Sequence, residues 1–525
     1  MVIRIVSGQN VVFLVIKFDY MKIFTSEQVK LIDKYTIENE PVSSINLMER
    51  AASQCIGWLT NKFSRNFTFK IFVGPGNNGG DGLAIARLLE QNDYKVAVYL
   101  IKVSDKLSPD ASINLDLLIK NKKVTVKEII QPDELPQINA DDVTIDALFG
   151  YGLSRPLTGL AAETIEYLNR CPGPKVAIDI PSGLTGEGVV SGSAVFVAAD
   201  TLTFQFPFLS FLFAENSNYI GKWRLMNIGL HPQIINQTPS VFHLLELNDI
   251  SIKNRPEFGH KGTFGHALLI AGSSVMAGAS VLSSKSCLRT GCGLITVHIP
   301  KDIANIIYAA FPESLVSTDL SNKHFSSLPD ISKFSAIGIG PGIGTAKESL
   351  KALHELLEIC NKPLVIDADA LNIISTEKEL LKIIPKNSVL TPHPLEFDRL
   401  FGKSTNSYER LLKQLDKAHE LGICIVLKGH YTSVASPDGT CYFNSTGNSG
   451  MATGGSGDVL TGIILSLLAQ GYESKTAAIN GVFIHGMAGD IAAEETGMEA
   501  LIASDIINCI GKAFIKIKLT QDEKS

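Results

Sequence analysis

The chain has 525 residues, 45% of them hydrophobic and 19% charged, a length that predicts about two to four domains. The hydrophobic fraction is that of ordinary globular proteins, which excludes a wholly disordered or collagen-like chain. With 47 basic and 53 acidic side chains the net charge is −6, so we expect no nucleic-acid partner, because binding a phosphate backbone usually needs a basic excess.

The N-terminal segment differs in pattern from the rest of the chain. Its apolar run, Val11–Ile16, is shorter than the roughly 20 residues that span a bilayer. No small-residue cleavage site of a signal peptide comes after it, and a second methionine, Met21, opens a better-patterned segment. We therefore expect residues 1–20 to be an upstream extension or a loose tail, and we expect no transmembrane segment.

Residues 21–240 are predicted to form a first α/β domain. Apolar spacing over Val29–Tyr35 and Ile45–Ile56 predicts two amphipathic helices. Short apolar runs then alternate with helical stretches, which is typical of a parallel sheet covered by helices on both faces. The expected strands are Phe69–Val73, Val96–Ile101, Val124–Ile130, Val143–Leu148 and Val176–Ile180, with helices at Leu83–Leu89 and Ala161–Leu168 between them.

Residues 241–525 are predicted to form a second α/β domain. The segment His231–Glu257, with three prolines, is the expected linker. The second series of strands is Ala267–Ala271, Leu294–Ile299, Ala336–Ile339, Leu364–Ile366, Val389–Leu390 and Ile423–Leu427, and residues 474–515 are expected to form two long helices.

The eight cysteines are scattered, without a Cys-x-x-Cys pair or a matching histidine spacing. This usage is too dilute for a disulfide framework and lacks the spacing of a zinc site. It predicts reduced thiols in a cytoplasmic protein.

In the first domain, polar side chains follow three of the expected strands. The stretch Val73–Gly82 is a glycine-rich turn without the lysine of a P-loop, but its paired asparagines and Asp81 favour a binding site over a bare turn. Asp146 and Asp179 end two further strands. Because the carboxyl ends of parallel strands meet at one edge, these carboxylates and Asn78 could supply the oxygens of an alkali or alkaline-earth ion site.

In the second domain, the strongest motif is Thr446–Leu460, with five glycines before an apolar helix. Such a helix start can bind phosphate oxygens, and Asp458 in its first turn could accept a proton from an attacking hydroxyl. The alternative is an acid that only stabilises the helix end. Lys428–Thr432 lies where a nucleotide could bind, or is an ordinary turn, and Asp367 and Asp369 share a face if their strand persists.

Together these motifs resemble a known family. Asn-Asn-Gly-Gly-Asp-Gly and Asp-Ile-Pro-Ser-Gly resemble the YjeF N-terminal domain. Lys-Gly-Thr-Phe-Gly-His, Thr-Pro-His-Pro-Leu-Glu-Phe and Gly-Gly-Ser-Gly-Asp-Val-Leu resemble the YjeF C-terminal domain. Their fusion is similar to the bifunctional NAD(P)H-hydrate repair enzymes of bacteria, from about Met21 to near the C-terminus. The resemblance implies a Rossmann-like three-layer α/β/α domain followed by a ribokinase-like α/β domain.

The resemblance also implies activities and site residues. The first domain would interconvert the R and S forms of NADH hydrate and NADPH hydrate, and the second would dehydrate the S form with ADP, releasing AMP and phosphate. Asp179 and Asp458 would be catalytic. The epimerase would bind the hydrate through Asn77, Asn78, Gly79, Gly80, Asp81, Gly150, Tyr151, Gly152, Leu153, Ser154, Arg155, Pro156 and Asp179. The dehydratase would contact the hydrate through Ala267, Gly342, His393 and Asp458, and the nucleotide through Lys428, Gly429, His430, Tyr431, Thr432 and Gly457.

By the same resemblance, Asn78, Asp146 and Ser182 would bind K⁺, and Mg²⁺ would assist in the dehydratase domain without a ligand set that the sequence reveals. We also expect a homo-oligomer. Two alternatives stay open. A small-molecule kinase would show Asp-Thr-x-Gly-Ala-Gly-Asp, but here the stretch is Ala452–Asp458 and the leading acid is absent. The first domain could also be a non-enzymatic binding module, although its intact Asp146 and Asp179 favour catalysis.

Overall fold

The computed structural model describes residues 2–7, 10–15, 20–40, 42–153, 155–189, 192 and 194–522. The chain divides into two compact units. The N-terminal unit comprises Lys22–Ser240 and Asn406–Tyr408, and the C-terminal unit comprises Met1–Met21, Val241–Thr405 and Glu409–Ser525. Each unit is built on one main sheet, so the predicted class, a two-domain α/β chain, is confirmed.

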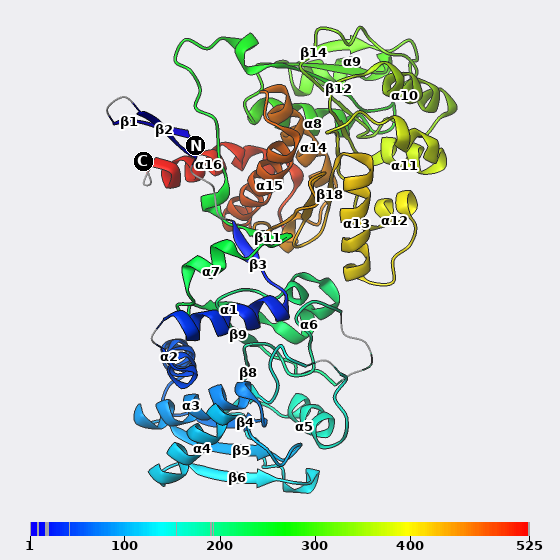
Figure 1. The fold of residues 1–525 in the computed structure, drawn as a ribbon. Helices are drawn as coiled ribbons and strands as arrows, with labels where there is room; N and C mark the ends of the chain where they lie inside the picture. The colour runs from blue at the N-terminus through cyan, green and yellow to red at the C-terminus, as the bar shows by residue number, and fades with distance from the viewer. Residues whose placement is uncertain are drawn as a thin grey trace. The chain divides into compact units, whose positions relative to one another are not determined.

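The N-terminal unit contains a seven-stranded parallel sheet in the order β10-β9-β8-β7-β4-β5-β6 (Figure 1). The strands are β4 (Thr68–Val73), β5 (Lys95–Ile101), β6 (Thr125–Ile129), β7 (Asp142–Ala147), β8 (Lys175–Ile178), β9 (Asp200–Phe204) and β10 (Lys222–Met226). The helices are α1 (Ser26–Asn39), α2 (Ser44–Lys62), α3 (Asn77–Gln91), α4 (Pro109–Asn121), α5 (Gly159–Arg170), α6 (Ser217–Ile220) and α7 (Pro232–Gln237). All five predicted strands are present.

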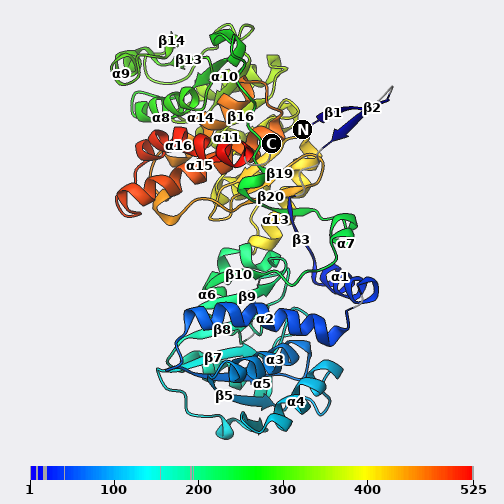
Figure 2. The same cartoon turned by 90° about the vertical axis from the view of Figure 1, so that its left-hand side faces the viewer.

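Strand β4 shows how the two faces of this sheet are covered. Phe69 and Ile71 pack in one cluster with α2, α3 and α4, whereas Phe72 packs in another with α5. Side chains of a strand alternate between faces, so a strand with helices on both sides is apolar throughout. This is the three-layer α/β/α arrangement that the uninterrupted apolar runs predicted: α3 and α4 lie on one side of β4 and β5 and α5 on the other in Figure 1, and Figure 2 looks onto the side of α3.

The second sheet has eleven strands in the order β14-β13-β12-β15-β16-β17-β18-β19-β20-β11-β3, of which β11 to β20 belong to the C-terminal unit. Its strands are β3 (Met21–Ile23), β11 (Phe242–Leu245), β12 (His266–Ile270), β13 (Leu294–Ile299), β14 (Leu315–Thr318), β15 (Ala336–Ile339), β16 (Leu364–Ile366), β17 (Val389–Leu390), β18 (Cys424–Leu427), β19 (Ser433–Ala435) and β20 (Cys441–Asn444). The strands from β14 to β18 are parallel, while β19 is antiparallel to both of its neighbours.

The helices of this part of the chain are α8 (Ala277–Arg289), α9 (Ala304–Ala310), α10 (Lys347–Ile359), α11 (Ala368–Thr376), α12 (Pro394–Phe401), α13 (Ser407–Leu421), α14 (Ser456–Ala469), α15 (Ser474–Thr496) and α16 (Ala503–Asp522). Helices α8, α14, α15 and α16 share one core with the sheet. From Val459 to Ala469 every residue of α14 is buried, because this helix is apolar on all sides.

Two segments differ from a plain linker or tail. The expected linker contains α7 and β11, and β11 pairs in parallel with β20. Near the N-terminus, β1 (Val2–Ser7) and β2 (Asn10–Val15) form an antiparallel pair. All eight cysteines are free. Among the described residues, no helix is long and apolar enough to cross a membrane.

Candidate active sites

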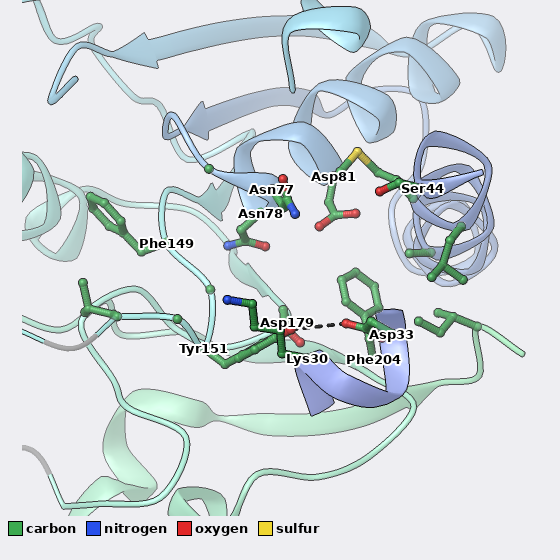
Figure 3. A pocket seen from close by; sticks show the side chains of 18 of the residues that line it. Lys30, Asp33, Ser44, Asn77, Asn78, Asp81, Phe149, Tyr151, Asp179 and Phe204 are labelled. Atoms are coloured by element: carbon green, nitrogen blue, oxygen red, sulfur yellow. Dashed lines mark hydrogen bonds between the residues drawn. The ribbon is translucent and has the colours of Figure 1, made fainter. Parts of the chain in front are cut away.

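In the N-terminal unit, a pocket of about 940 Å³ lies at the carboxyl edge of the sheet (Figure 3). Residues that follow β4, β7 and β8 line it, together with Phe204 at the end of β9 and side chains of α1 and α2. Ligands of parallel sheets bind at this edge, where the loops are free to carry polar groups. The strand ends after β4, β7 and β8 therefore meet in one cavity, which Asp179 lines, whereas Asp146 is fully buried within β7.

The glycine-rich turn after β4 leads directly into α3. Asn77, Asn78 and Asp81 line the pocket. Gly79 is needed for close packing, because a Cβ there would lie 1.9 Å from the carbonyl oxygen of Gly74, and a Cβ at Gly80 would lie 2.8 Å from the Met48 side chain. The two glycines thus let the start of α3 approach its neighbours, and their predicted contact with substrate stays a prediction.

The loop after β7 forms a second wall. Its lining residues are Leu148, Phe149, Gly150, Tyr151, Gly152, Leu153 and Arg155. Ser154, also predicted to bind substrate, lies outside the described residues. Pro156 follows the last lining residue of this loop. Most of the predicted loop therefore does face the cavity.

Asp179, the predicted catalytic residue, follows β8 with a left-handed backbone, φ 66°. Non-glycine residues adopt this conformation rarely, and it is concentrated at functional sites. The side chain is only 5% exposed and accepts hydrogen bonds from the backbone N–H groups of Tyr151 and Phe204. Burial raises the pKa of Asp179 to about 7, against the effect of these bonds, and the neighbouring Asp33 contributes in the same direction.

Two more carboxyl groups lie in the same pocket, and Figure 3 shows them around the same space as Asp179. Burial raises the pKa of Asp33, on α1, to about 6 and that of Asp81 well above its usual value. The hydroxyl of Tyr151 donates a hydrogen bond to Asp33, 3.2 Å away. Asp33 was not predicted as a site residue, although it lies four residues after Val29, on the face of α1 that is turned inward.

The proposed K⁺ ligands fit an oxygen-binding cation. Both side-chain polar atoms of Asn78 are buried without a hydrogen-bond partner. Asp146 is fully buried, and its carboxylate accepts hydrogen bonds from the Ser182 hydroxyl (2.7 Å) and from the backbone N–H groups of Ser182 and Leu148. All these donors are neutral, and burial raises the pKa of Asp146 to about 6. A buried carboxyl group without a cationic partner and a buried amide oxygen without a hydrogen bond are each suited to a bound cation.

In the C-terminal unit, Lys428 lies at the centre of the polar strand ends. Its Nζ donates to Asp367 Oδ1 at 2.9 Å and is 3.8 Å from Glu396 Oε2. Burial alone lowers the pKa of Lys428, but the two carboxylates outweigh burial and raise it. Asp367 also accepts from the Thr461 hydroxyl at 2.7 Å, which ties β16 to α14. The lysine is therefore held as a partly buried cation.

Asp458 lies in the first turn of α14, while Gly455 (φ 88°) occupies the N-cap. Burial raises the pKa of Asp458 to about 7; Asp367 adds to this effect, and Lys428 opposes it. A carboxyl group with such a pKa can serve as a base near neutral pH. At the adjoining Gly457, a Cβ would lie 3.5 Å from Lys428 Nζ, so the two predicted nucleotide contacts adjoin each other.

The rest of the predicted nucleotide segment forms a tight turn after β18. Gly429 N–H donates to the Thr432 hydroxyl, which in turn donates to the Gly429 carbonyl. The rings of His430 and Tyr431 meet edge to face, with 4.6 Å between their centroids. The turn presents its atoms next to Lys428, as a nucleotide contact requires.

The predicted hydrate contacts are only partly brought together. Gly342 (φ 67°) follows β15 and His393 is the N-cap of α12, where its Nδ1 accepts from the N–H groups of Leu395 and Glu396. Ala267 is fully buried and paired within the sheet. It lies three residues before the end of β12, roughly 10 Å from the carboxyl edge at about 3.3 Å per residue. The structure does not bring Ala267 together with the others.

Two features of this site were not predicted. Asp367 and Asp369 do not share a strand face, because β16 ends at Ile366 and α11 begins at Ala368. Asp369 instead accepts from Gly344 N–H at 2.9 Å. His485, on α15, lies 3.4 Å from the Ser456 hydroxyl, and burial lowers its pKa to about 4. A lone histidine in an apolar helix gave no signal in the sequence.

Comparison with known proteins agrees with this division of the chain. A family model described as NAD(P)H-hydrate dehydratase matches residues 267–512, and one described as YjeF-related protein N-terminus matches residues 44–209. A solved ADP/ATP-dependent NAD(P)H-hydrate dehydratase from Bacillus subtilis, co-crystallised with ATP and Mg²⁺, is 31% identical and covers 51% of this chain and 94% of its own, with a TM-score of 0.44.

Full-length relatives cover both units. The bifunctional NAD(P)H-hydrate repair enzyme of Thermofilum pendens is 35% identical over 94% of this chain and 96% of its own length. The enzyme of Moorella thermoacetica is 33% identical over 93% of this chain and 96% of its own length. That of Escherichia coli is 32% identical over 84% of each chain. The chain therefore belongs to the family of bifunctional NAD(P)H-hydrate repair enzymes.

Proposed function

We propose that the chain repairs hydrated NADH and NADPH in two steps, epimerisation in the N-terminal unit and ADP-dependent dehydration of the S epimer in the C-terminal unit. One observation supports the proposed two-step repair most directly. Each unit has, at the carboxyl edge of its sheet, a carboxyl group whose pKa burial raises to about 7, Asp179 and Asp458. Each reaction needs such a group, because each must move a proton to or from the hydroxyl of the hydrate near neutral pH.

In the dehydration, hydroxide must become a better leaving group. Asp458 takes the proton of the C6 hydroxyl. The hydroxyl oxygen then attacks the terminal phosphorus of ADP, and AMP departs. Lys428 and the N–H groups at the start of α14 face the phosphate charge that builds up. The lone pair of the adjoining ring nitrogen then expels phosphate as the N1=C6 bond forms, and loss of a proton from C5 restores the C5=C6 double bond and returns the electron pair to nitrogen. The products are NAD(P)H, AMP and phosphate.

Cations complete both sites. We infer that Asn78, Asp146 and Ser182 hold K⁺, which supplies fixed positive charge beside the substrate. In the C-terminal unit, Asp367 and Asp369 follow β16, and Glu396 follows β17. These carboxylates fit Mg²⁺, which typically binds one or two carboxylates together with substrate phosphates. The homo-oligomeric state and the cytoplasmic location stay predictions.

The proposal is tested by incubating the full chain with a mixture of both NADH hydrate epimers and ADP. Recovery of the reduced-nicotinamide absorbance from the whole mixture is the expected result. A small-molecule kinase would consume nucleotide without restoring that absorbance. A chain whose N-terminal unit only binds ligands would stop when the S epimer is exhausted. The time course of this absorbance distinguishes the three outcomes.

The nucleotide choice is a separate prediction. We expect ADP to support dehydration better than ATP at equal concentration, as the resemblance implies. The measurement is the initial rate of absorbance recovery with each nucleotide over the same range of concentrations. Equal or faster recovery with ATP would contradict this assignment.

The identity of the cation gives a further prediction. Replacing K⁺ by tetramethylammonium should slow epimerisation, because the larger ion cannot enter a cage formed by the Asn78 amide and the Asp146 and Ser182 oxygens. Dehydration of pure S epimer in the same buffers serves as the control for general salt effects. An epimerisation rate that does not depend on the cation would remove K⁺ from the site.

A further inference from the structure

The N-terminal pocket holds more carboxyl groups than a single proton transfer requires. Asp33 comes from α1, Asp81 from α3 and Asp179 from the loop after β8. The other charged side chains that line the pocket are Lys30, Lys34, Glu38 and Arg155. Like charges buried together disfavour ionisation of all of them. The pocket is thus built to hold both protonated and ionised carboxyl groups at neutral pH.

Tyr151 links two of these groups. Its hydroxyl donates to the carboxylate of Asp33 at 3.2 Å, and its backbone N–H donates to the carboxylate of Asp179. Both carboxyl groups therefore lie beside Tyr151 in the same pocket. Figure 3 shows Tyr151, Asp33 and Asp179 close together in the pocket, with Asp81 facing the same space.

The proposed reaction itself calls for two such groups. The hydroxyl of the hydrate sits on a carbon bonded to the ring nitrogen, which resembles the anomeric carbon of a sugar. Inversion at an anomeric carbon uses one carboxylic acid to protonate the leaving oxygen and a second carboxylate, on the opposite face, to activate water. Epimerisation is also an inversion, and it must run in both directions. Each carboxyl group must then act as acid in one direction and as base in the other.

We propose that Asp33 is a second catalytic residue of the epimerase, acting on one face of the hydrated ring while Asp179 acts on the other, with Tyr151 holding the pair. This inference rests on the proposed epimerase function. It extends the site from one acid–base group to two, and it adds α1 to the catalytic elements.

Inversion at C6 proceeds through loss and return of water. One carboxylic acid gives its proton to the C6 hydroxyl, the C6–O bond breaks and water departs, while the nitrogen lone pair forms the N1=C6 double bond. A water on the opposite face then attacks C6 as the other carboxylate takes its proton. The new C6–O bond forms and the electron pair of N1=C6 returns to nitrogen. One water leaves, one enters, and one proton passes from one carboxyl group to the other.

Asp81 is the competing candidate for the second group. It also lines the pocket, but burial and the neighbouring Asp179 raise the pKa of Asp81 well above its usual value. The hydroxyl of Tyr151 donates to Asp33, so Asp33 is the group that this side chain orients. The pKa of Asp33 is raised only to about 6, so this group is available in both forms. The geometry through Tyr151 and the accessible charge states agree on Asp33.

The test uses the full chain and follows the interconversion of purified R or S hydrate without ADP, in water labelled with heavy oxygen. The wild-type protein should incorporate the label as it inverts C6. Asp33→Asn should slow interconversion by about 10²-fold or more and still exchange label into one epimer, through Asp179. Asp179→Asn should exchange label into the other epimer only. Glu27→Gln, an exposed carboxylate on the same helix, is the matched control and should behave as wild type.

Tyr151→Phe is the second variant. It should slow interconversion by about tenfold at unchanged KM, because it removes only the bond that orients Asp33. Three results would overturn the proposal: wild-type inversion without label, which indicates ring opening; Asp33→Asn at the wild-type rate; or single-epimer exchange in Asp81→Asn but not in Asp33→Asn. If the wild-type chain does not interconvert the epimers at all, the proposed epimerase function fails instead. Circular dichroism and Tm confirm that each variant is folded.

Discussion

Asp458→Asn is expected to lower ADP-dependent recovery of reduced nicotinamide by about 10²-fold or more, the usual scale for loss of a general base. Asparagine keeps the size of the side chain and most of its hydrogen bonding. The helix start should persist, because Gly455 rather than Asp458 is the N-cap of α14. Nucleotide affinity, measured by calorimetry, should therefore change little while the rate of the chemical step falls.

The pH dependence of the wild-type rate tests the same assignment. A general base acts in its ionised form, and the pKa of Asp458 is raised to about 7. The rate should thus rise as pH increases through about 7 and level off above it. Because the folded-state pKa lies above the unfolded value, the ionised carboxylate costs stability at pH 8. The Asn variant should accordingly unfold at a Tm no lower than that of the wild type there.

Glu348→Gln provides the matched control. Glu348 is an acid in the first turn of α10, as Asp458 is in the first turn of α14, and it lies outside the site. Both substitutions remove a carboxylate from the first turn of a helix; at Asp458 the cost of the buried charge outweighs its favourable place at the helix start. Only the Asp458 variant should lose activity. An active Asn variant would show that Asp458 does no more than stabilise its helix.

The sequence was most informative where strands are buried on both faces. The runs Phe69–Val73 and Leu294–Ile299 are continuous because helices cover both sides of each strand, and both strands are present. Strand β9, by contrast, has two threonines and an aspartate in five residues, and β14 is half exposed. Their apolar pattern is too weak to separate them from loops. Whether these segments form strands depends on pairing with a neighbouring strand, which a short stretch of sequence does not reveal.

The same reasoning applies to the sites. Strand-end motifs could be located because parallel strands bring their carboxyl ends to one edge, and Asn78 and Asp179 do line one pocket. The ion pair of Lys428 with Asp367 spans 61 positions of sequence, so no local pattern predicts it. Asp33 belongs to a helix far from every glycine-rich motif. Its role depends on where α1 packs, which only the folded chain reveals.

Asp179→Ala in the full chain is expected to separate the two activities completely. With a mixture of epimers and saturating ADP, this variant should recover only the absorbance of the S fraction and leave the R epimer, apart from slow spontaneous epimerisation. The reason is that alanine removes the buried acid–base group of the N-terminal pocket, while nothing in the C-terminal unit changes. The decisive quantity is the final amplitude, because the initial rate reports only on S epimer already present.

Complementation makes this expectation sharper. Asp179→Ala keeps an intact dehydratase site, and Asp458→Asn keeps an intact epimerase site. Neither variant alone should convert the whole mixture of epimers, whereas the two together should reach the wild-type amplitude. The epimerised hydrate passes between molecules through solution, so the rescue should quicken with the concentration of the Asp458→Asn protein. If Asp179→Ala alone reached full amplitude as fast as the wild-type chain, Asp179 would not be a catalytic residue of epimerisation.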